Sequence, residues 1–194
     1  VSGVIKRQSK IAVVGVNGAG KSTFLKVLAG QTEPTSGTVS LGANVELGYF
    51  SQHTMEVLDP KKSIFDTVQE VLPLANRGVI MNLLGAFLFS GDAVDKRIEN
   101  LSGGEKSRVV LATLLGRPIN FLILDEPTNH LDIRSREMLL DALQNFTGTV
   151  ILVSHDRHFL RHLVDRVLEV DHGEMRAYEG NYEYYLEKSH HFVH

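Results

Sequence analysis

The sequence of 194 residues contains no cysteine and no tryptophan. Without cysteine it has neither disulfides nor cysteine-ligated metal sites, and it suits a reducing compartment, so we expect a cytoplasmic protein. A long hydrophobic run is also lacking. The longest, at residues 79–89, is too short to span a bilayer and is interrupted by Asn82 and Gly85. We therefore expect no direct insertion into a membrane, and no secretory signal sequence is recognisable.

The sequence also lacks an excess of charge of one sign. Its formal net charge of −3 gives no overall attraction to nucleic acid or to anionic membranes. The contents of 43% hydrophobic and 22% charged residues are those of a folded globular protein rather than a disordered one. The first residue is valine rather than methionine, so we expect a fragment of a longer protein or a processed chain.

Short apolar runs alternate with stretches of helical periodicity along the chain. This alternation predicts an α/β fold with a mostly parallel sheet. We expect strands at residues 11–14, 45–50, 121–124 and 150–153, and a terminal hairpin from strands at 167–170 and 175–178. We expect helices at about 21–29, 63–72, 77–89, 103–116, 133–146 and 157–164.

The predicted strands are unevenly distributed, because residues 53–100 contain none that is strong. We interpret 1–194 as a single domain with a core lobe at 1–52 and 117–194. A helical lobe at about 53–116 is inserted into it. The apolar stripe at 79–89 is expected to form the core of this small lobe.

Residues 11–23, IAVVGVNGAGKST, match the Walker A pattern of phosphate-binding loops, with a predicted strand before and a helix after. Gly15, Gly18 and Gly20 allow a tight turn and a close approach of the backbone to phosphate. Lys21 is expected to bridge the β- and γ-phosphates, and the Ser22 hydroxyl to bind Mg²⁺. The other residues expected to bind nucleotide here are Asn17, Ala19 and Thr23.

Two adjacent carboxylates, Asp125 and Glu126, follow the apolar run at 121–124. Such a pair suits general acid/base chemistry, metal binding or a helix start. Glycosidase acids flank a sugar bond from separate places, so adjacent residues fit that chemistry badly. Beside a phosphate loop, Asp125 is expected to hold Mg²⁺ and Glu126 to polarise the attacking water. Asp132 is also a natural N-cap for the helix that follows it.

Residues 101–105, LSGGE, form a second glycine-containing segment. Ser102 is a good N-cap, and Glu105 completes a capping-box pattern. Gly103 and Gly104 in the first turn cost roughly 1 kcal/mol each relative to alanine. Close approach to a ligand would explain them.

Together these segments resemble the ATP-binding cassette (ABC) family. Gln52 after Tyr49-Phe50-Ser51 resembles its Q-loop, and His155 in the sequence VSHD resembles its switch histidine. The resemblance implies a P-loop NTPase fold with a RecA-like core, an ATPase that needs ATP and Mg²⁺, and Gln52 among the groups that sense Mg²⁺ and the γ-phosphate. It also implies that His155 steadies the attacking water and that catalysis depends on Glu126, His155, Gln52 and Lys21.

In that family two cassettes pair head to tail around ATP. The resemblance implies that the signature residues Ser102, Gly103, Gly104 and Glu105 bind ATP held by the partner cassette, and that Asp132 lies at the interface. The partner is a second cassette in the same chain or in a homodimer. Because the composite sites need this partner, we expect weak ATPase activity from the chain alone. The family's upstream antiparallel strands and adenine-stacking aromatic residue are expected to be cut off here.

Three features favour one branch of the family. The first is the sequence Asn-His-Leu-Asp at 129–132 together with the run at 154–160, which resembles the ABC-F branch of tandem-cassette ATPases, many of which act on the ribosome. The second is the helical lobe between Gln52 and the signature segment, which is short beside that of a typical transporter cassette. The third is the tyrosine-rich segment at 178–185, which resembles the segment after the last hairpin of ABC-F cassettes. We therefore expect ribosome or RNA as a partner of the full-length protein. We also expect a C-terminal cassette here, with an N-terminal cassette that lacks the arm as the alternative. The alternative is the motor subunit of a membrane transporter. A DNA-repair cassette with a long coiled coil is disfavoured because no heptad run is present.

Two groups of histidines could bind metal, but we favour simpler interpretations for both. His158 and His162 lie four residues apart on a predicted helix, without an evident third ligand beyond Asp156, so we expect a solvated or packed pair. The histidines of residues 190–194 are expected to belong to a frayed terminus.

Overall fold

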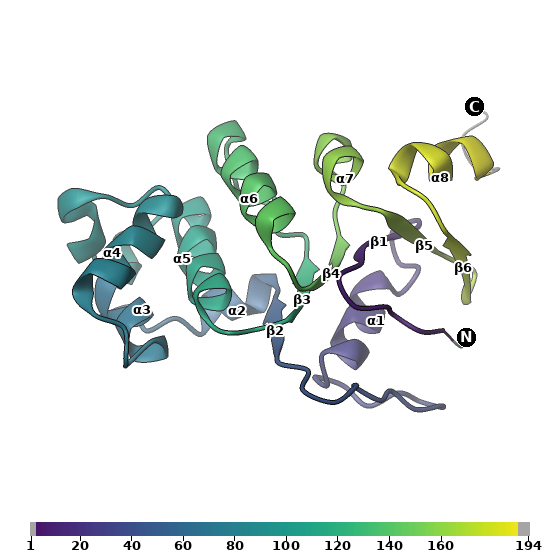
Figure 1. Cartoon of the computed structure of the whole chain (residues 1–194), viewed down its shortest axis with the longest axis horizontal. Coiled ribbons are helices and arrows are strands. Elements are labelled where there is room, and N and C mark those ends of the chain that lie inside the picture. Colours follow the sequence, from purple (N-terminus) through teal and green to yellow (C-terminus); the bar gives the residue numbers. More distant parts are fainter. Residues whose placement is uncertain (1–2, 190–194) are drawn as a thin grey trace.

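The structure is a computed structural model that describes residues 3–189. A six-stranded sheet in the order β2-β3-β4-β1-β5-β6 forms its centre (Figure 1). Every neighbouring pair is parallel except β5 and β6, which form the expected antiparallel hairpin. The prediction of a mostly parallel α/β sheet is thereby confirmed. The strands are β1 (Lys10–Val14), β2 (Leu47–Phe50), β3 (Phe121–Asp125), β4 (Thr149–Val153), β5 (Arg166–Asp171) and β6 (Glu174–Tyr178).

Helices cover both faces of the sheet, so its central strands are buried on both sides. All five residues of β4 are buried, which explains why this strand is a continuous apolar run rather than an alternating one. One face packs against α1 (Lys21–Leu28). The opposite face lies under α6 (Ile133–Asn145), α7 (Arg157–Leu163) and α8 (Tyr182–Lys188) (Figure 1).

A helical lobe lies beyond the β2 edge of the sheet (Figure 1). Ile80 and Leu84 of the apolar stripe are fully buried, so the stripe forms the core of this lobe. The short α2 and the two 3-10 turns were not predicted, because segments of three to five residues carry too little periodicity. The elements are α2 (Gln52–Glu56), α3 (Ile64–Val71), α4 (Arg77–Ala86), η1 (Gly91–Asp95), η2 (Ile98–Asn100) and α5 (Gly103–Gly116).

The carboxyl ends of β1, β3 and β4 lie next to one another at one edge of the sheet. The phosphate loop follows β1, Asp125 ends β3 with Glu126 directly after it, and His155 follows β4. Parallel α/β sheets bind ligands at this edge. Across residues 3–189, no helix combines the length and the hydropathy that crossing a membrane requires.

Candidate functional site

The phosphate loop, residues 15–20, joins β1 to α1 and depends on glycine at its first position. Gly15 has φ +150°, and a Cβ added there would lie 2.2 Å from the Val170 carbonyl oxygen of β5. Any larger residue would force the loop away from the sheet. The start of the loop therefore packs closely against β5.

Lys21 begins α1, and its side chain folds back over the phosphate loop. Its Nζ donates hydrogen bonds to the carbonyl oxygens of Gly15 at 2.8 Å and Val16 at 3.0 Å. The ammonium thus lies above the loop, at the N-terminal end of the α1 dipole, where an anion is stabilised. A hollow of about 310 Å³ opens there. It is lined by Asn17, Gly18, Gly20, Lys21, Ser22, Thr23, Glu126, Val153 and His155.

Glu126 is turned into this hollow by an uncommon backbone conformation. Its φ is +51°, in the left-handed region, and its N–H donates to the Val153 carbonyl oxygen at 2.9 Å. The chain therefore leaves β3 sharply, and Glu126 faces the end of β4. Strain of this kind in a non-glycine residue costs about 1–3 kcal/mol and is typical of functional positions.

His155 holds the Glu126 carboxylate at two points. Its Nε2 lies 3.1 Å from Oε1, and its backbone N–H donates to Oε2 at 3.3 Å. Burial raises the pKa of Glu126, while His155 acts in the opposite direction. The carboxylate is thus oriented, only 19% exposed, and more basic than an ordinary glutamate. These are the properties of a general base.

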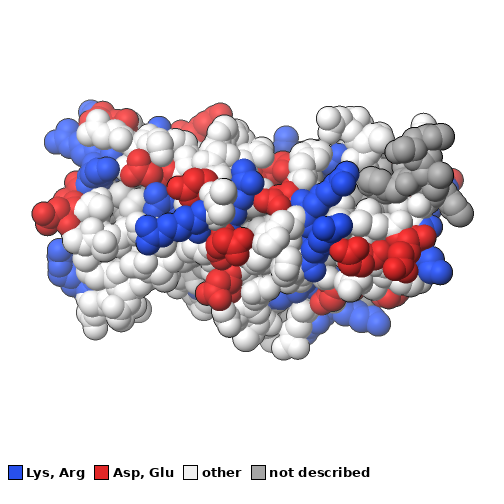
Figure 2. All heavy atoms as spheres, turned by 90° about the horizontal axis from the view of Figure 1, so that it is seen from above, with Lys and Arg blue, Asp and Glu red and all other residues white. Residues whose placement is uncertain are grey.

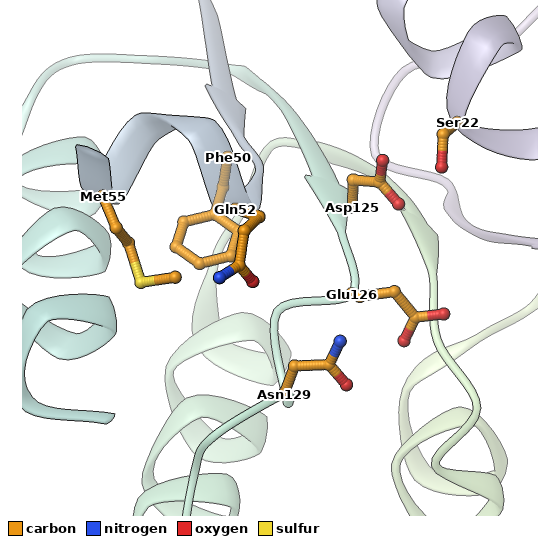
Figure 3. Close-up of a pocket in the computed structure, with 7 residues that line it drawn as sticks. All are labelled: Ser22, Phe50, Gln52, Met55, Asp125, Glu126 and Asn129. Atoms are coloured by element: carbon orange, nitrogen blue, oxygen red, sulfur yellow. The ribbon is translucent and has the colours of Figure 1, made fainter. Parts of the chain in front are cut away.

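A second hollow of about 200 Å³ adjoins the first and shares Ser22 and Glu126 with it. The side chains of Ser22 and Asp125 point toward each other (Figure 3). Gln52 also lines this hollow, on the side of Asp125 that is away from Ser22. A hydroxyl, a carboxylate and an amide oxygen are the hard oxygen donors that Mg²⁺ prefers, so the residues fit that ion. The complete lining is Ser22, Phe50, Gln52, Met55, Asp125, Glu126 and Asn129.

The phosphate-loop residues, Gln52 and the two acids therefore meet at one site, whereas the signature segment does not. Ser102, Gly103, Gly104 and Glu105 begin α5 and line neither hollow. Within residues 3–189, no three acidic or histidine side chains converge in a way that would hold a metal ion. A Mg²⁺ site here would rest on the single carboxylate of Asp125 with Ser22 and Gln52.

The expected caps of the signature segment and of α6 are both present. The Ser102 hydroxyl accepts the Glu105 N–H at 3.2 Å, and the Glu105 carboxylate accepts the Ser102 N–H at 3.2 Å. The Asp132 carboxylate accepts the Ser135 N–H at 2.7 Å, so it caps α6 as predicted. Its position at an interface between cassettes stays a prediction.

The two signature glycines have different surroundings. A Cβ at Gly104 would lie 2.5 Å from the His130 carbonyl oxygen, whereas a Cβ at Gly103 would approach only the His130 side chain, at 3.7 Å. From the sequence, close approach to a ligand was the explanation offered for the presence of both glycines. The structure gives Gly104 an additional reason within its own chain, since the loop at 126–132 packs against it.

Four lining residues of the two hollows were not among the predicted site residues. Phe50 and Met55 provide the apolar part, and Val153 lies at the end of β4. Asn129 faces the hollow beside Glu126 (Figure 3). In the sequence, Asn129 is distinguished only by its place three residues after Glu126. It was therefore used only as part of the resemblance to the ABC-F branch, and not as a site residue.

The side hypothesis of a zinc site on α7 finds no third ligand among the described residues. His158 Nε2 pairs with Glu137 Oε1 at 3.0 Å, and the rings of His158 and His162 lie 4.3 Å apart. The expected interpretation was a solvated or packed pair, and the His158 side chain is 58% exposed while its ring lies against that of His162. The histidines of residues 190–194 lie outside the described residues.

Comparisons with known proteins agree with this geometry. The family model described as "ABC transporter" matches residues 1–129. The chain is 47% identical over 186 residues to ABC transporter F family member 5 of Arabidopsis thaliana, covering 95% of this chain and 27% of that protein. It is 46% identical over 188 residues to YdiF of Bacillus subtilis (strain 168), covering 97% of this chain and 29% of that protein. The chain thus spans less than a third of these relatives.

A solved structure has the same fold. A chain in the complex of the archaeal ribosomal stalk protein aP1 with the archaeal ribosome recycling factor aABCE1 superimposes with a TM-score of 0.72 at 29% identity. The match covers 89% of this chain and 34% of that one. The P-loop fold of the present chain is therefore that of ABC ATPase cassettes.

Proposed function

This chain belongs to the ATP-binding cassette family, and from that premise we propose that it binds and hydrolyses ATP as one cassette of an F-branch protein that acts on the ribosome. One observation carries the ATPase proposal. The hollow over the phosphate loop and the hollow beside Asp125 share Ser22 and Glu126, so phosphate-binding and water-activating groups face one space.

The phosphate loop binds the triphosphate of ATP. Backbone amides of residues 18–22 and the N-terminus of α1 stabilise its negative charge, together with the Lys21 ammonium above the loop. Ser22, Gln52 and Asp125 hold Mg²⁺, which neutralises phosphate charge when it is bound.

Glu126 accepts the proton of the water that attacks the γ-phosphate. Its raised pKa favours proton acceptance, and its two contacts with His155 fix the carboxylate in the hollow. Lys21 stabilises the charge on the transferring phosphoryl group, and Gln52 lies on the opposite side of the same space. Catalysis depends on positioning and electrostatics, as is usual for phosphoryl transfer.

The signature segment completes the site of a partner cassette rather than its own. Its residues line neither hollow of this chain, and Val16 and Ile133, near the phosphate loop and Asp132, are exposed apolar residues suited to an interface. In a head-to-tail pair, Ser102 and Gly103 approach the γ-phosphate of the partner's ATP. The chain alone therefore hydrolyses ATP slowly.

The ribosome is proposed as the partner of the full-length protein on the basis of relatives. A named F family member is among them, and the aABCE1 of the solved complex is a ribosome recycling factor. On the face of the molecule formed by α6, α7 and α8, basic and acidic side chains are interspersed (Figure 2). Arg136–Asp156 and Arg161–Glu183 are paired there. Ribosome contact is thus expected through parts of the full-length protein other than this mixed face.

The Glu126→Gln variant tests the ATPase proposal. It removes the base but keeps the size of the side chain, so Mg·ATP binding should persist while kcat falls at least about 100-fold. Glu137→Gln is the matched control, because Glu137 also pairs with a histidine but lines neither hollow. Unchanged turnover in Glu126→Gln, or an equal loss in Glu137→Gln, would remove Glu126 from this role.

Sedimentation of the same variant at full length tests the partner. In lysate with ATP, we expect the Glu126→Gln protein to co-migrate with ribosomes, because a closed and unhydrolysed state persists. Release on replacing ATP with ADP is the control. Association with the membrane fraction instead would favour the transporter alternative.

A further inference from the structure

Glu169 is a buried carboxylate that the proposed mechanism does not use. It lies on β5, is only 3% exposed, and accepts two tyrosine hydrogen bonds. The Tyr178 hydroxyl donates to Oε2 at 2.9 Å, and the Tyr185 hydroxyl donates to Oε1 at 3.0 Å. Burying a carboxylate is costly unless it is paired and hydrogen-bonded. An apolar residue would pack there at lower cost, so the acid calls for a reason beyond packing.

The two hydroxyls come from the tyrosine-rich segment at 178–185. Tyr178 ends β6 and Tyr185 lies in α8, and their rings meet edge to face at 5.1 Å. The Asn181 side chain accepts the Tyr184 N–H at 3.0 Å and so begins α8 at the position that brings Tyr185 over β5. Burial, and then the neighbouring Glu169, raise the pKa of Tyr185, so its hydroxyl remains a donor. Through these two hydroxyls, the segment binds α8 and the end of β6 to the Glu169 carboxylate.

The same stretch of β5 supports the phosphate loop. Glu169 is in register with Val14, the last residue of β1, and the next residue, Val170, presents its carbonyl to Gly15. A Cβ at Gly15 would approach that oxygen to 2.2 Å. Lys21 in turn donates to the Gly15 carbonyl. Direct contacts thus connect β5 at Glu169 to the start of the loop.

We propose that Glu169 is a positioning residue for the phosphate loop, and that α8 acts as a clasp whose docking through Tyr178 and Tyr185 holds β5 against Gly15. Docking of α8 and binding of the triphosphate are then linked, each favouring the other. This inference rests on the proposed ATP-binding function for its ligand, while the contacts of α8 with β5 and of β5 with the loop exist without nucleotide.

The Tyr185→Phe variant tests the clasp with the full-length protein. It removes one hydroxyl and keeps the ring. Glu169→Gln keeps both hydroxyls but replaces one of the two accepting carboxylate oxygens with an amide nitrogen. Tyr184→Phe is the matched control, because Tyr184 is in the same helix but 42% exposed. We expect Tyr185→Phe and Glu169→Gln to raise the Kd and KM for Mg·ATP about tenfold, with kcat within about twofold, since the coupling acts on binding. Tyr184→Phe should match the wild type.

Hydrogen exchange separates this proposal from the ATPase proposal. Without nucleotide, Tyr185→Phe should speed amide exchange in residues 15–20 as well as in 182–188. In the wild type, Mg·ATP should slow exchange in both segments. Faster exchange confined to 182–188, together with a wild-type Kd for ATP, overturns the clasp. If the wild-type protein binds no ATP, the proposed ATPase function is wrong. The clasp proposal is still tested in that case, by comparing the amide exchange of residues 15–20 between the wild type and Tyr185→Phe without nucleotide.

Discussion

Alanine at the two adjacent signature glycines should change stability in opposite directions. Both substitutions gain helix propensity, up to about 1 kcal/mol and less in a first turn. At Gly103 the new methyl group meets the His130 side chain at an ordinary 3.7 Å, so we expect a gain of about 0.5 kcal/mol. At Gly104 it meets the His130 backbone oxygen at 2.5 Å, so the loop at 126–132 must shift. Overpacking of that kind costs about 1–3 kcal/mol.

Because the propensity gain is common to both variants, their difference isolates the contact with His130. We expect the free energy of unfolding of Gly104→Ala to be about 1–3 kcal/mol below that of Gly103→Ala. Urea denaturation of both proteins in parallel measures it. Equal stabilisation of the two variants would refute the packing of the loop on α5. A separate readout is turnover: Gly103→Ala should hydrolyse ATP more slowly despite its higher stability, if Gly103 approaches the partner's nucleotide.

Three further predictions concern single residues of the motifs. Ser102→Ala removes the capping box and should lower the free energy of unfolding by about 1 kcal/mol in urea; an unchanged midpoint would contradict it. Because burial raises the pKa of Glu126, and the base must be ionised, the acid-side fall of kcat should lie at a higher pH than for an ordinary glutamate. An acid-side fall of kcat at the pH of an ordinary glutamate would contradict the role of Glu126 as the base. Gly15→Ala should abolish ATP binding because its methyl group meets Val170. Gly173→Ala, also at a positive φ but with open space around the added methyl group, should bind ATP normally. Calorimetric titration with Mg·ATP distinguishes the two variants.

The sequence was most informative where local rules decide the outcome. The phosphate loop, the caps at Ser102 and Asp132 and the buried strand β4 follow from turn chemistry, capping and apolar continuity within about ten residues. The resemblance to the ABC family then implied that Gln52 and the acids lie at the nucleotide site beside the phosphate loop. The short α2 was missed because five residues carry no clear period.

What could not be predicted depends on contacts between distant segments. The approach of His130 to Gly104 joins residues 26 positions apart, and no local pattern in either segment indicates it. The left-handed conformation of Glu126 follows from its bond to Val153 on the neighbouring strand. The burial of Glu169 beneath two tyrosines likewise exists only once β5, β6 and α8 have packed together.

The identity of the nucleotide held after mixing with Mg·ATP tests the central claim most directly. The full-length protein is mixed with ATP, separated from free nucleotide and quenched, and the bound nucleotide is identified by chromatography. The account predicts that wild-type protein converts bound ATP to ADP, whereas Glu126→Gln retains intact ATP over the same interval. Recovery of ADP from Glu126→Gln at the wild-type rate would contradict the account.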